Sequence, residues 1–299
     1  MRRILFVLCG IMLSMAFAMQ APAAEKPKNN NEIVAMQNAP GDPAAKDSVQ
    51  LEYYGHSAMR IVTPKGLSIM IDPWKNDPSG TWGIWFPKEF PLTRADVAMS
   101  THAHYDHNAL HRVTAHMVID RMAGTWTFGD VRITGIADKH QYQYPGPVRW
   151  TDLFAERGID PVPPNNPPVL DNNIYVVETG GMRICHWGDN RPDAPDSVFK
   201  AIGRPDVLIL PLDDSLHILD YPQANSIIAK LNPRIIIPTH YLMKGISSVA
   251  STLIAPESWL KEQKSVIRHT SPQYALIPSE VAKMDKHVLY YGDNAIKPE

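Results

Sequence analysis

The sequence predicts an α/β fold in which two mixed β-sheets pack face to face with helices on their outer sides, a four-layer αββα sandwich. Short apolar runs bounded by turn residues recur from residue 49 onward. Hairpin turns occur in both halves of the chain, at Pro64-Lys65-Gly66 and at Gly180-Gly181. Helical segments lie between some of the strands. Strands, hairpins and helices in this mixture favour two packed sheets over an alternating βα barrel.

The strands and helices can be placed in order along the chain. Nine segments fit strands: 49–54, 58–63, 67–71, 95–100, 131–137, 174–178, 182–186, 207–211 and 234–238. Three segments fit helices: 108–116, 221–231 and 249–264. Residues 74–93 and 141–172 have no regular pattern, and loops of this length are usually lids, binding loops or insertions.

The first 24 residues are typical of a secretory signal peptide. Arg2 and Arg3 form a charged start, residues 4–17 an apolar run, and residues 21–24 a small-residue cleavage region. A membrane anchor is the alternative, but the run falls short of the roughly 20 residues that a spanning helix needs. We therefore expect a periplasmic or secreted protein without stable membrane insertion, with a flexible leader at 25–48 and one domain at 49–299.

Charge and cysteine content restrict the possible functions. Removing the positive charges of Arg2 and Arg3 changes the formal net charge from −2 to −4, which argues against a general nucleic-acid binder. Cys9 lies in the predicted signal peptide, so Cys185 would be the only cysteine of the mature chain and no internal disulfide could form. Its apolar surroundings predict a buried inert thiol rather than a nucleophile.

One short motif is dense in metal-binding groups. Directly after the strand predicted at 95–100 comes Thr101-His102-Ala103-His104-Tyr105-Asp106-His107. Imidazole and carboxylate are ligands that zinc and similar divalent ions accept, and a turn after a strand lets neighbouring side chains point at different ions. The motif therefore predicts a metal site.

Further ligands must come from distant positions, because so short a motif cannot complete two coordination shells. His140, Asp189 and His240 each follow a predicted strand, and sites in α/β sheets gather at the carboxyl ends of strands. The alternative for each is a polar residue satisfied by backbone hydrogen bonds. His186 is an alternative ligand to His140, although a role in the pocket fits it better.

The order of these motifs resembles the metallo-β-lactamase-fold superfamily over roughly residues 49–245. The run Tyr54-Gly55-His56-Ser57 and the closing run 235–241 look most like the branch of ascorbate-phosphate-lactonase-like hydrolases and the N-acyl-phosphatidylethanolamine phospholipase D group. The motifs that match the superfamily are Ile71-Asp72-Pro73, His102 to His107, His140, Gly188-Asp189 and Pro238-Thr239-His240.

The resemblance implies two divalent metal ions, most often zinc, with manganese or iron in some branches. Asp72 would orient a ligand histidine, with a strand-end cap as its alternative. His56 would either line the pocket or make a structural hydrogen bond. The implied ligands are His102, His104 and His140 for one ion, Asp106, His107 and His240 for the other, and Asp189 as the bridge between them.

The implied activity is that of a binuclear hydrolase acting on a lactone, ester, amide or phosphodiester bond of a small-molecule or lipid-like substrate. In such sites two metals about 3.5–4 Å apart lower the pKa of a water, and the resulting hydroxide attacks the carbonyl or phosphoryl centre. Asp106 is the candidate general base as well as a ligand.

Three other functions are compatible with the fold: an iron-dependent sulfur or oxygen oxidoreductase, a β-lactamase, and a metal-binding protein without turnover. The presence of both His104 and His107 favours the hydrolase, because di-iron members typically replace an early histidine with a carboxylate. Asp213, Asp214 and His217 stand where related hydrolases more often have small residues. The substrate of a relative therefore cannot be assumed for this chain.

The remaining aromatic and histidine residues allow weaker expectations. Trp82, Trp85 and Phe86 either form an apolar lid or pack their long loop onto the core. His111 and His116 are expected to be ordinary polar positions.

Overall fold

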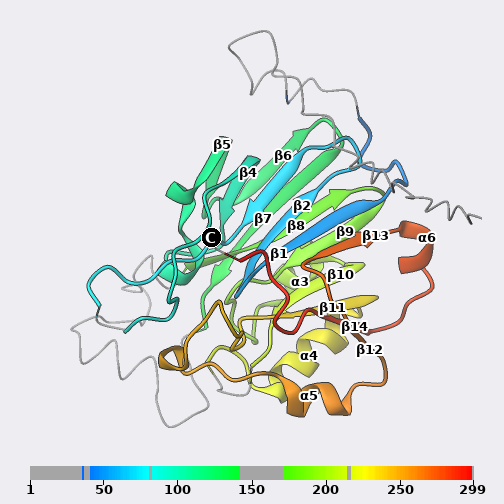
Figure 1. Cartoon of the computed structure of the whole chain (residues 1–299). Coiled ribbons are helices and arrows are strands. Elements are labelled where there is room, and N and C mark those ends of the chain that lie inside the picture. Colours follow the sequence, from blue (N-terminus) through cyan, green and yellow to red (C-terminus); the bar gives the residue numbers. More distant parts are fainter. Residues whose placement is uncertain (1–35, 37–40, 81–82, 142–170, 214–216, 298–299) are drawn as a thin grey trace, which may run out of the picture.

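The computed structural model describes residues 36, 41–80, 83–141, 171–213 and 217–297. The predicted signal peptide, most of the predicted leader and residues 142–170 of the second long loop lie outside the described residues. The described chain forms two β-sheets with helices alongside (Figure 1).

The first sheet is built mainly from the N-terminal part of the domain. Its β1–β2–β3 meander is antiparallel, the second turn lies at the predicted Pro64–Gly66 hairpin, and β3, β4 and β5 run parallel. In spatial order the strands are β13 (Gln273–Leu276), β1 (Val49–Gly55), β2 (Ala58–Val62), β3 (Ser68–Ile71), β4 (Thr93–Ser100) and β5 (Val113–Asp120).

The second sheet comes from the rest of the chain. A hairpin at Gly180-Gly181 joins β8 and β9, and β9, β10, β11, β14 and β12 run parallel. In spatial order the strands are β12 (Val266–Arg268), β14 (His287–Tyr290), β11 (Ile235–Thr239), β10 (Val207–Pro211), β9 (Met182–His186), β8 (Asp171–Thr179), β7 (Val131–Lys139) and β6 (Gly124–Phe128).

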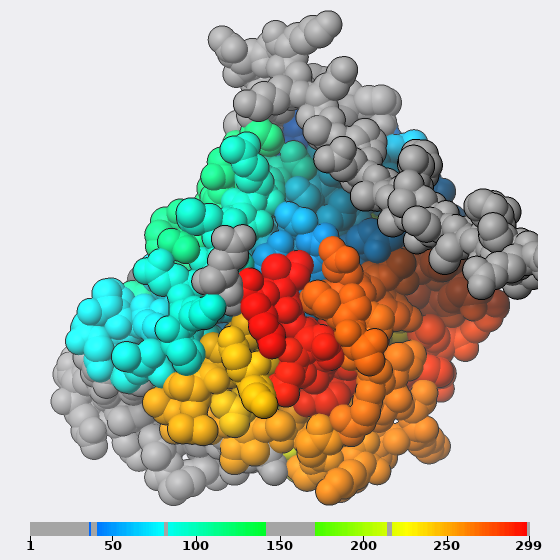
Figure 2. Space-filling view, viewed as in Figure 1, coloured from blue at the N-terminus to red at the C-terminus, as the bar shows by residue number. Residues whose placement is uncertain are grey.

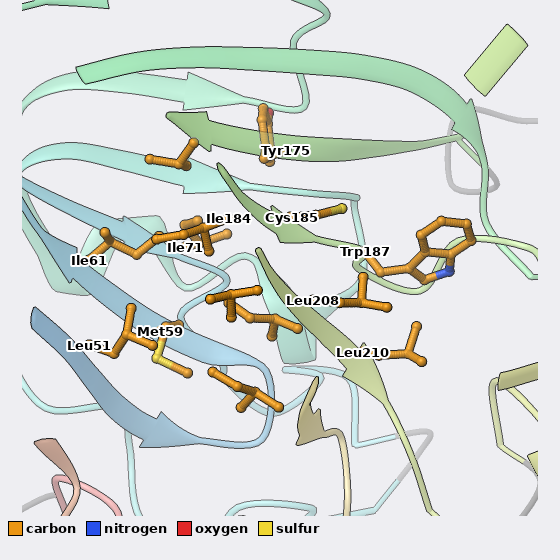
Figure 3. Close-up of a cluster of buried hydrophobic side chains, with 14 of the residues drawn as sticks. Leu51, Met59, Ile61, Ile71, Tyr175, Ile184, Cys185, Trp187, Leu208 and Leu210 are labelled. Carbon is orange, nitrogen blue, oxygen red and sulfur yellow. The ribbon is translucent and has the colours of Figure 1, made fainter. Parts of the chain in front are cut away.

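The hydrophobic core draws on both sheets. Leu51 and Ile61 of the first sheet and Ile184 and Leu208 of the second belong to one cluster of fully buried side chains (Figure 3). Apolar burial of this extent supplies the main stabilising free energy of a domain without disulfides. Cys185 lies in this core as a free thiol, and burial raises its pKa to about 12, as expected for an inert cysteine.

The described helices are short except for one. α4 (Tyr221–Leu231) starts with a capping box between Asp220 and Gln223 and buries Ile227 and Leu231 in the core. The others are α3 (Asp196–Ile202), α5 (Glu257–Glu262) and α6 (Pro278–Val281). No described helix is long and apolar enough to cross a membrane.

The predicted α/β class, the two mixed sheets, all nine predicted strands and the helix at 221–231 are confirmed. The helix predicted at 108–116 is wrong: a short 3₁₀ turn, Leu110–Arg112, leads directly into β5. The helix predicted at 249–264 is reduced to the 3₁₀ turn Val249–Ser251 and α5, because the chain reaches Pro256 between them. Strands β5, β6, β12, β13 and β14 were not predicted.

Candidate metal centre

Every predicted ligand lies just after the end of a strand, and these ends meet at one edge of the two sheets. His102 and His104 follow β4, and a 3₁₀ turn, Tyr105–His107, presents Asp106 and His107. The second sheet adds three more. These are His140 after β7, Asp189 after β9 and His240 after β11.

Three histidines form the first donor set. One ring nitrogen from each of His102, His104 and His140 lies within 4.8 Å of the other two. Their ring centroids are 4.4–4.7 Å apart. This is the trio predicted to hold one ion.

The second donor set has distances close to those of a tetrahedral ion. His107 Nε2 lies 3.5 Å from Asp106 Oδ2 and 3.3 Å from Asp189 Oδ2. His240 Nε2 lies 3.4 Å from Asp106 Oδ2 and 3.3 Å from Asp189 Oδ2. Ligands bound at about 2.0–2.1 Å around a tetrahedral zinc are themselves about 3.3–3.4 Å apart. These four nitrogen–oxygen separations match the ligand spacing around such an ion.

Asp189 faces both donor sets with the same oxygen. Besides the two contacts above, its Oδ2 lies 3.6 Å from His140 Nε2 and 3.8 Å from His102 Nε2. This is the placement that a bridging carboxylate requires.

Buried atoms without hydrogen bonds provide a separate test of the metal hypothesis. Among the described residues, the Nε2 atoms of His102, His107 and His240 and the Oδ1 atom of Asp189 are buried and have no hydrogen-bond partner. Buried polar atoms are rarely left unsatisfied in native proteins unless a water or ion completes them. A divalent ion can bind nitrogen and oxygen atoms of this kind. The residues at this site therefore fit a metal centre.

Hydrogen bonds on the far side of the rings explain why Nε2 points inward. Asp72 Oδ2 accepts from His107 Nδ1 at 2.9 Å, and the Gln141 carbonyl accepts from His140 Nδ1 at 2.6 Å. Thr101 Oγ1 donates to Asp72 and so accepts from His102 Nδ1 at 3.0 Å. With a proton held on Nδ1, Nε2 is the ring nitrogen that is left to bind an ion at the centre.

The electrostatics of the second donor set favour positive charge. Burial lowers the pKa of His107, but Asp189, Asp106 and Asp72 outweigh it and raise this pKa well above its usual value. The pKa of His240 is raised to about 10, because Asp189 and Asp106 outweigh burial. In the first set burial lowers the pKa of His104 to about 3. Without a metal ion, protons on His107 and His240 therefore balance the negative charge of the carboxylates, at the place where a metal cation fits.

His56 lies inside the site rather than at its edge. Its Nε2 is 3.0 Å from Asp106 Oδ2, and its ring lies on that of His240 with centroids 4.1 Å apart. Its carbonyl accepts hydrogen bonds from Tyr53 Oη and from the backbone N–H of His240. The sequence signal placed His56 near the site without indicating its contact with Asp106, which lies 50 residues further along the chain.

Three site residues have left-handed backbones. His56, Asp72 and His240 have φ values of 54°, 54° and 59°, a region that residues other than glycine rarely adopt. Such conformations persist where the surrounding structure enforces them, often at functional sites. Here the three residues place the His56 and His240 rings in the centre and the Asp72 carboxylate behind the ring of His107.

Two histidines do not face the centre. Both ring nitrogens of His186 are used elsewhere: Nε2 bonds to the Ser57 carbonyl at 3.0 Å, and Nδ1 accepts from the Gly188 N–H at 3.3 Å. This arrangement suits a supporting role rather than ligation. His116 lies 3.7 Å from Asp96, away from the cluster.

The end of β10 contributes a further pocket residue. The ring of His217 stacks on His240 with centroids 5.3 Å apart, and burial lowers its pKa to about 3, so that the ring is neutral. Asp213 is buried at the same strand end, and Asp214 lies outside the described residues.

The long loop after β3 is fixed by one asparagine that the sequence analysis did not single out. Asn76 accepts from the backbone N–H groups of Trp85 and Phe86 and donates to the Phe86 carbonyl. Phe86 is buried and stacks on Trp74. Trp85 lies at the site, its ring edge-on to His217 with centroids 5.1 Å apart. Trp82 lies outside the described residues.

Comparison with known proteins agrees with this geometry. Residues 50–240 match the family model of the β-lactamase superfamily domain. The chain belongs to this superfamily. A UPF0173 metal-dependent hydrolase of Koribacter versatilis is 26% identical over 203 residues, which cover 64% of this chain and 84% of the relative. A second UPF0173 metal-dependent hydrolase, from Thermodesulfovibrio yellowstonii, is 27% identical over 222 residues, covering 66% and 80%.

A solved structure supports the same assignment. A Thermotoga maritima protein described as a Zn-dependent hydrolase of the metallo-β-lactamase superfamily superposes with a TM-score of 0.57 at 25% identity, covering 81% of this chain and 98% of its own. The predicted superfamily and fold are thus confirmed. The present chain is a metal-dependent hydrolase of this superfamily. The narrower resemblance to the lactonase-like branch stays a prediction.

Proposed function

We propose that this hydrolase uses two divalent metal ions, zinc in the first instance. His102, His104 and His140 would hold one ion, Asp106, His107 and His240 the other, and Asp189 would bridge them. The observation that supports this most directly is the position of Asp189 Oδ2, which lies 3.3–3.8 Å from ligand nitrogens of both sets. Manganese and iron remain alternative ions, because the same donors accept them.

When bound, the ions would supply an activated water and neutralise negative charge that develops on the substrate. Hydrogen bonds to Thr101, Asp72 and the Gln141 carbonyl orient the rings of His102, His107 and His140 for this role. Asp106 is the proposed general base: burial raises its pKa, but the neighbouring rings of His107, His240 and His56 lower it well below its usual value. Its carboxylate is therefore ionised and able to orient a water and accept a proton.

The proposed reaction is hydrolysis of a lactone, ester, amide or phosphodiester bond in a small-molecule or lipid-like substrate. The predicted signal peptide places the proposed site of action in the periplasm or outside the cell. The alternatives are an antibiotic-degrading β-lactamase and an iron-dependent oxidoreductase of the same fold.

Two measurements test the proposal. Metal analysis after reconstitution should find close to two ions per chain, and a single ion at saturation would refute the binuclear site. Lactones, phosphodiesters, phospholipid-like esters and β-lactams should then be screened side by side. Turnover of β-lactams alone, or thiol-dependent oxygen consumption by an iron form, would favour the respective alternative.

A variant pair tests the role of Asp106. Asp106→Asn should reduce turnover of any substrate found by about 10²–10⁴-fold, the usual contribution of a general base. Asp285→Asn, which changes an exposed carboxylate outside the cluster, is the matched control. Equal activity of the two variants would contradict the assignment.

A further inference from the structure

Among the described residues, three of the large exposed apolar side chains come from two segments beside the metal centre. Ile84, Val249 and Ile254 have 64%, 84% and 47% of their surface exposed. Single exposed apolar residues are ordinary, whereas groups of them mark binding surfaces. We call these three residues, together with Trp85, the apolar rim.

The two segments of the apolar rim are bonded to each other. The Ser248 N–H donates to the Trp85 carbonyl at 2.7 Å, and the Ser248 hydroxyl donates to the Ile84 carbonyl. The Leu242 N–H donates to the Ile254 carbonyl, which ties the second segment to the chain just beyond His240. Figure 2 shows the two segments, cyan and gold, against one another on the surface.

The apolar rim is continuous with the centre through Trp85. This indole contacts the rings of His56 and His217 with centroid separations of 6.3 and 5.1 Å. His56 in turn lies 3.0 Å from the ligand candidate Asp106. Asn76 fixes the backbone of Trp85, so the surface is already formed before a ligand arrives. A group bound at the metals can therefore extend onto an apolar surface without leaving the protein.

We propose that the apolar rim binds a hydrocarbon chain of the substrate, so that the preferred substrates carry an alkyl or acyl group next to the bond that is hydrolysed. This inference rests on the proposed function for the position of that bond. The chain would lie across Trp85 towards Ile84 and Val249, away from the ligand nitrogens.

Chain-length dependence is the measurable consequence. Complete burial of a methylene changes an affinity about fourfold, and a chain covered on one side only should gain about half of that free energy, or twofold per methylene. Lengthening a ligand by four methylenes should thus tighten binding about 16-fold.

Binding of alkyl carboxylates tests this without requiring turnover. Butanoate and octanoate would be titrated into the zinc-reconstituted protein by calorimetry, since the carboxylate can reach the metals while the chain samples the apolar rim. The parent should bind octanoate about 16-fold more tightly than butanoate, and the double variant Ile84→Ser, Val249→Ser should lose most of this preference. Ile277→Ser is the control, because Ile277 is also exposed, at 47%, but precedes α6, far from the two segments in Figure 1.

Each outcome decides the question. Equal affinity for the two acids in the parent, or no binding of either, would overturn the proposal. So would an undiminished length dependence in the double variant, since the chain would then lie elsewhere. A change in oligomeric state of the double variant, read by size-exclusion chromatography, would assign the apolar rim to a subunit contact instead. Length-dependent binding without hydrolysis of any lactone, ester, amide or phosphodiester would retain the apolar rim as a hydrocarbon-binding surface and remove the proposed function.

Discussion

Replacing His56 should weaken metal binding at the second donor set, through Asp106. His56 Nε2 lies 3.0 Å from Asp106 Oδ2, the same oxygen that faces His107 and His240. In the tautomer with a proton on Nε2, the ring donates to the ligand oxygen and fixes its direction. A hydrogen bond to a charged group contributes about 1.5–3 kcal/mol. The expected loss of affinity is therefore about tenfold to hundredfold, the range typical of residues that orient metal ligands.

Two substitutions separate the hydrogen bond from the backbone conformation. Asparagine tolerates the left-handed backbone of His56 (φ 54°) but is too short to reach Asp106. Glutamine can place an amide donor near the position of Nε2, although histidine and asparagine adopt the left-handed backbone more readily than glutamine does. We expect His56→Asn to lose affinity for the second ion, and His56→Gln to retain it while melting at a lower temperature.

Stepwise zinc competition against a chelator measures both ions in one experiment, and the cobalt(II) absorption spectrum reports the coordination of each. Affinity for the first ion serves as the internal control, because the set of His102, His104 and His140 does not include His56. Wild-type affinity of His56→Asn for the second ion would refute the reasoning. Equal losses in both variants would show that the imidazole itself is required, which would also contradict action through Asp106.

Three further predictions follow from contacts around the centre. Asp72→Asn should lower the affinity for the second ion about 10–100-fold in the same chelator assay, because it removes the charge that His107 Nδ1 contacts at 2.9 Å. An unchanged affinity would contradict this prediction. Zinc affinity should rise with pH from about 6.5 towards 10, by about tenfold per pH unit for each displaced proton. In the metal-free protein burial lowers the pKa of His240, but Asp189 and Asp106 outweigh it and raise this pKa to about 10, so the ion must displace a proton. A zinc affinity that does not change with pH would contradict this prediction. Gly188→Ala should lower the free energy of unfolding by about 2–4 kcal/mol in denaturant titrations, since its φ is 61° and an added Cβ would lie 2.7 Å from Asn172 Oδ1; wild-type stability would be the contrary result.

The strands of the core were predictable because each is an apolar run between short turns. Burial of such a run in the core determines that it forms a strand. β5 shows where the pattern misleads. Leu110, Val113 and Met117 repeat at helical spacing, yet β5 alternates buried and exposed positions over part of its length as the edge strand of its sheet. Short apolar segments fit both periods, and pairing with β4 selects the strand.

The candidate site also has parts that the sequence predicts and parts that it does not. The cluster from His102 to His107 is local in sequence, so its chemistry could be inferred directly. The distant residues His140, Asp189 and His240 were placed by their position after strands, and the structure brings them to the cluster. Contacts such as His56 with Asp106, or Asn76 with the backbone of Trp85, depend on how loops cross at the sheet edge. No spacing along the chain encodes those crossings.

The division of the ligands between the two sheets has a consequence for biosynthesis. The candidate ligands up to His107 belong to the first sheet, whereas His140, Asp189 and His240 extend from the second. Neither donor set is complete within one sheet. A nascent chain therefore cannot assemble the second donor set until residue 240 has been synthesised and the two sheets have packed together. Ion capture would then be a late event, and a bound ion would act as a clasp between the sheets, so that its removal should loosen the whole molecule.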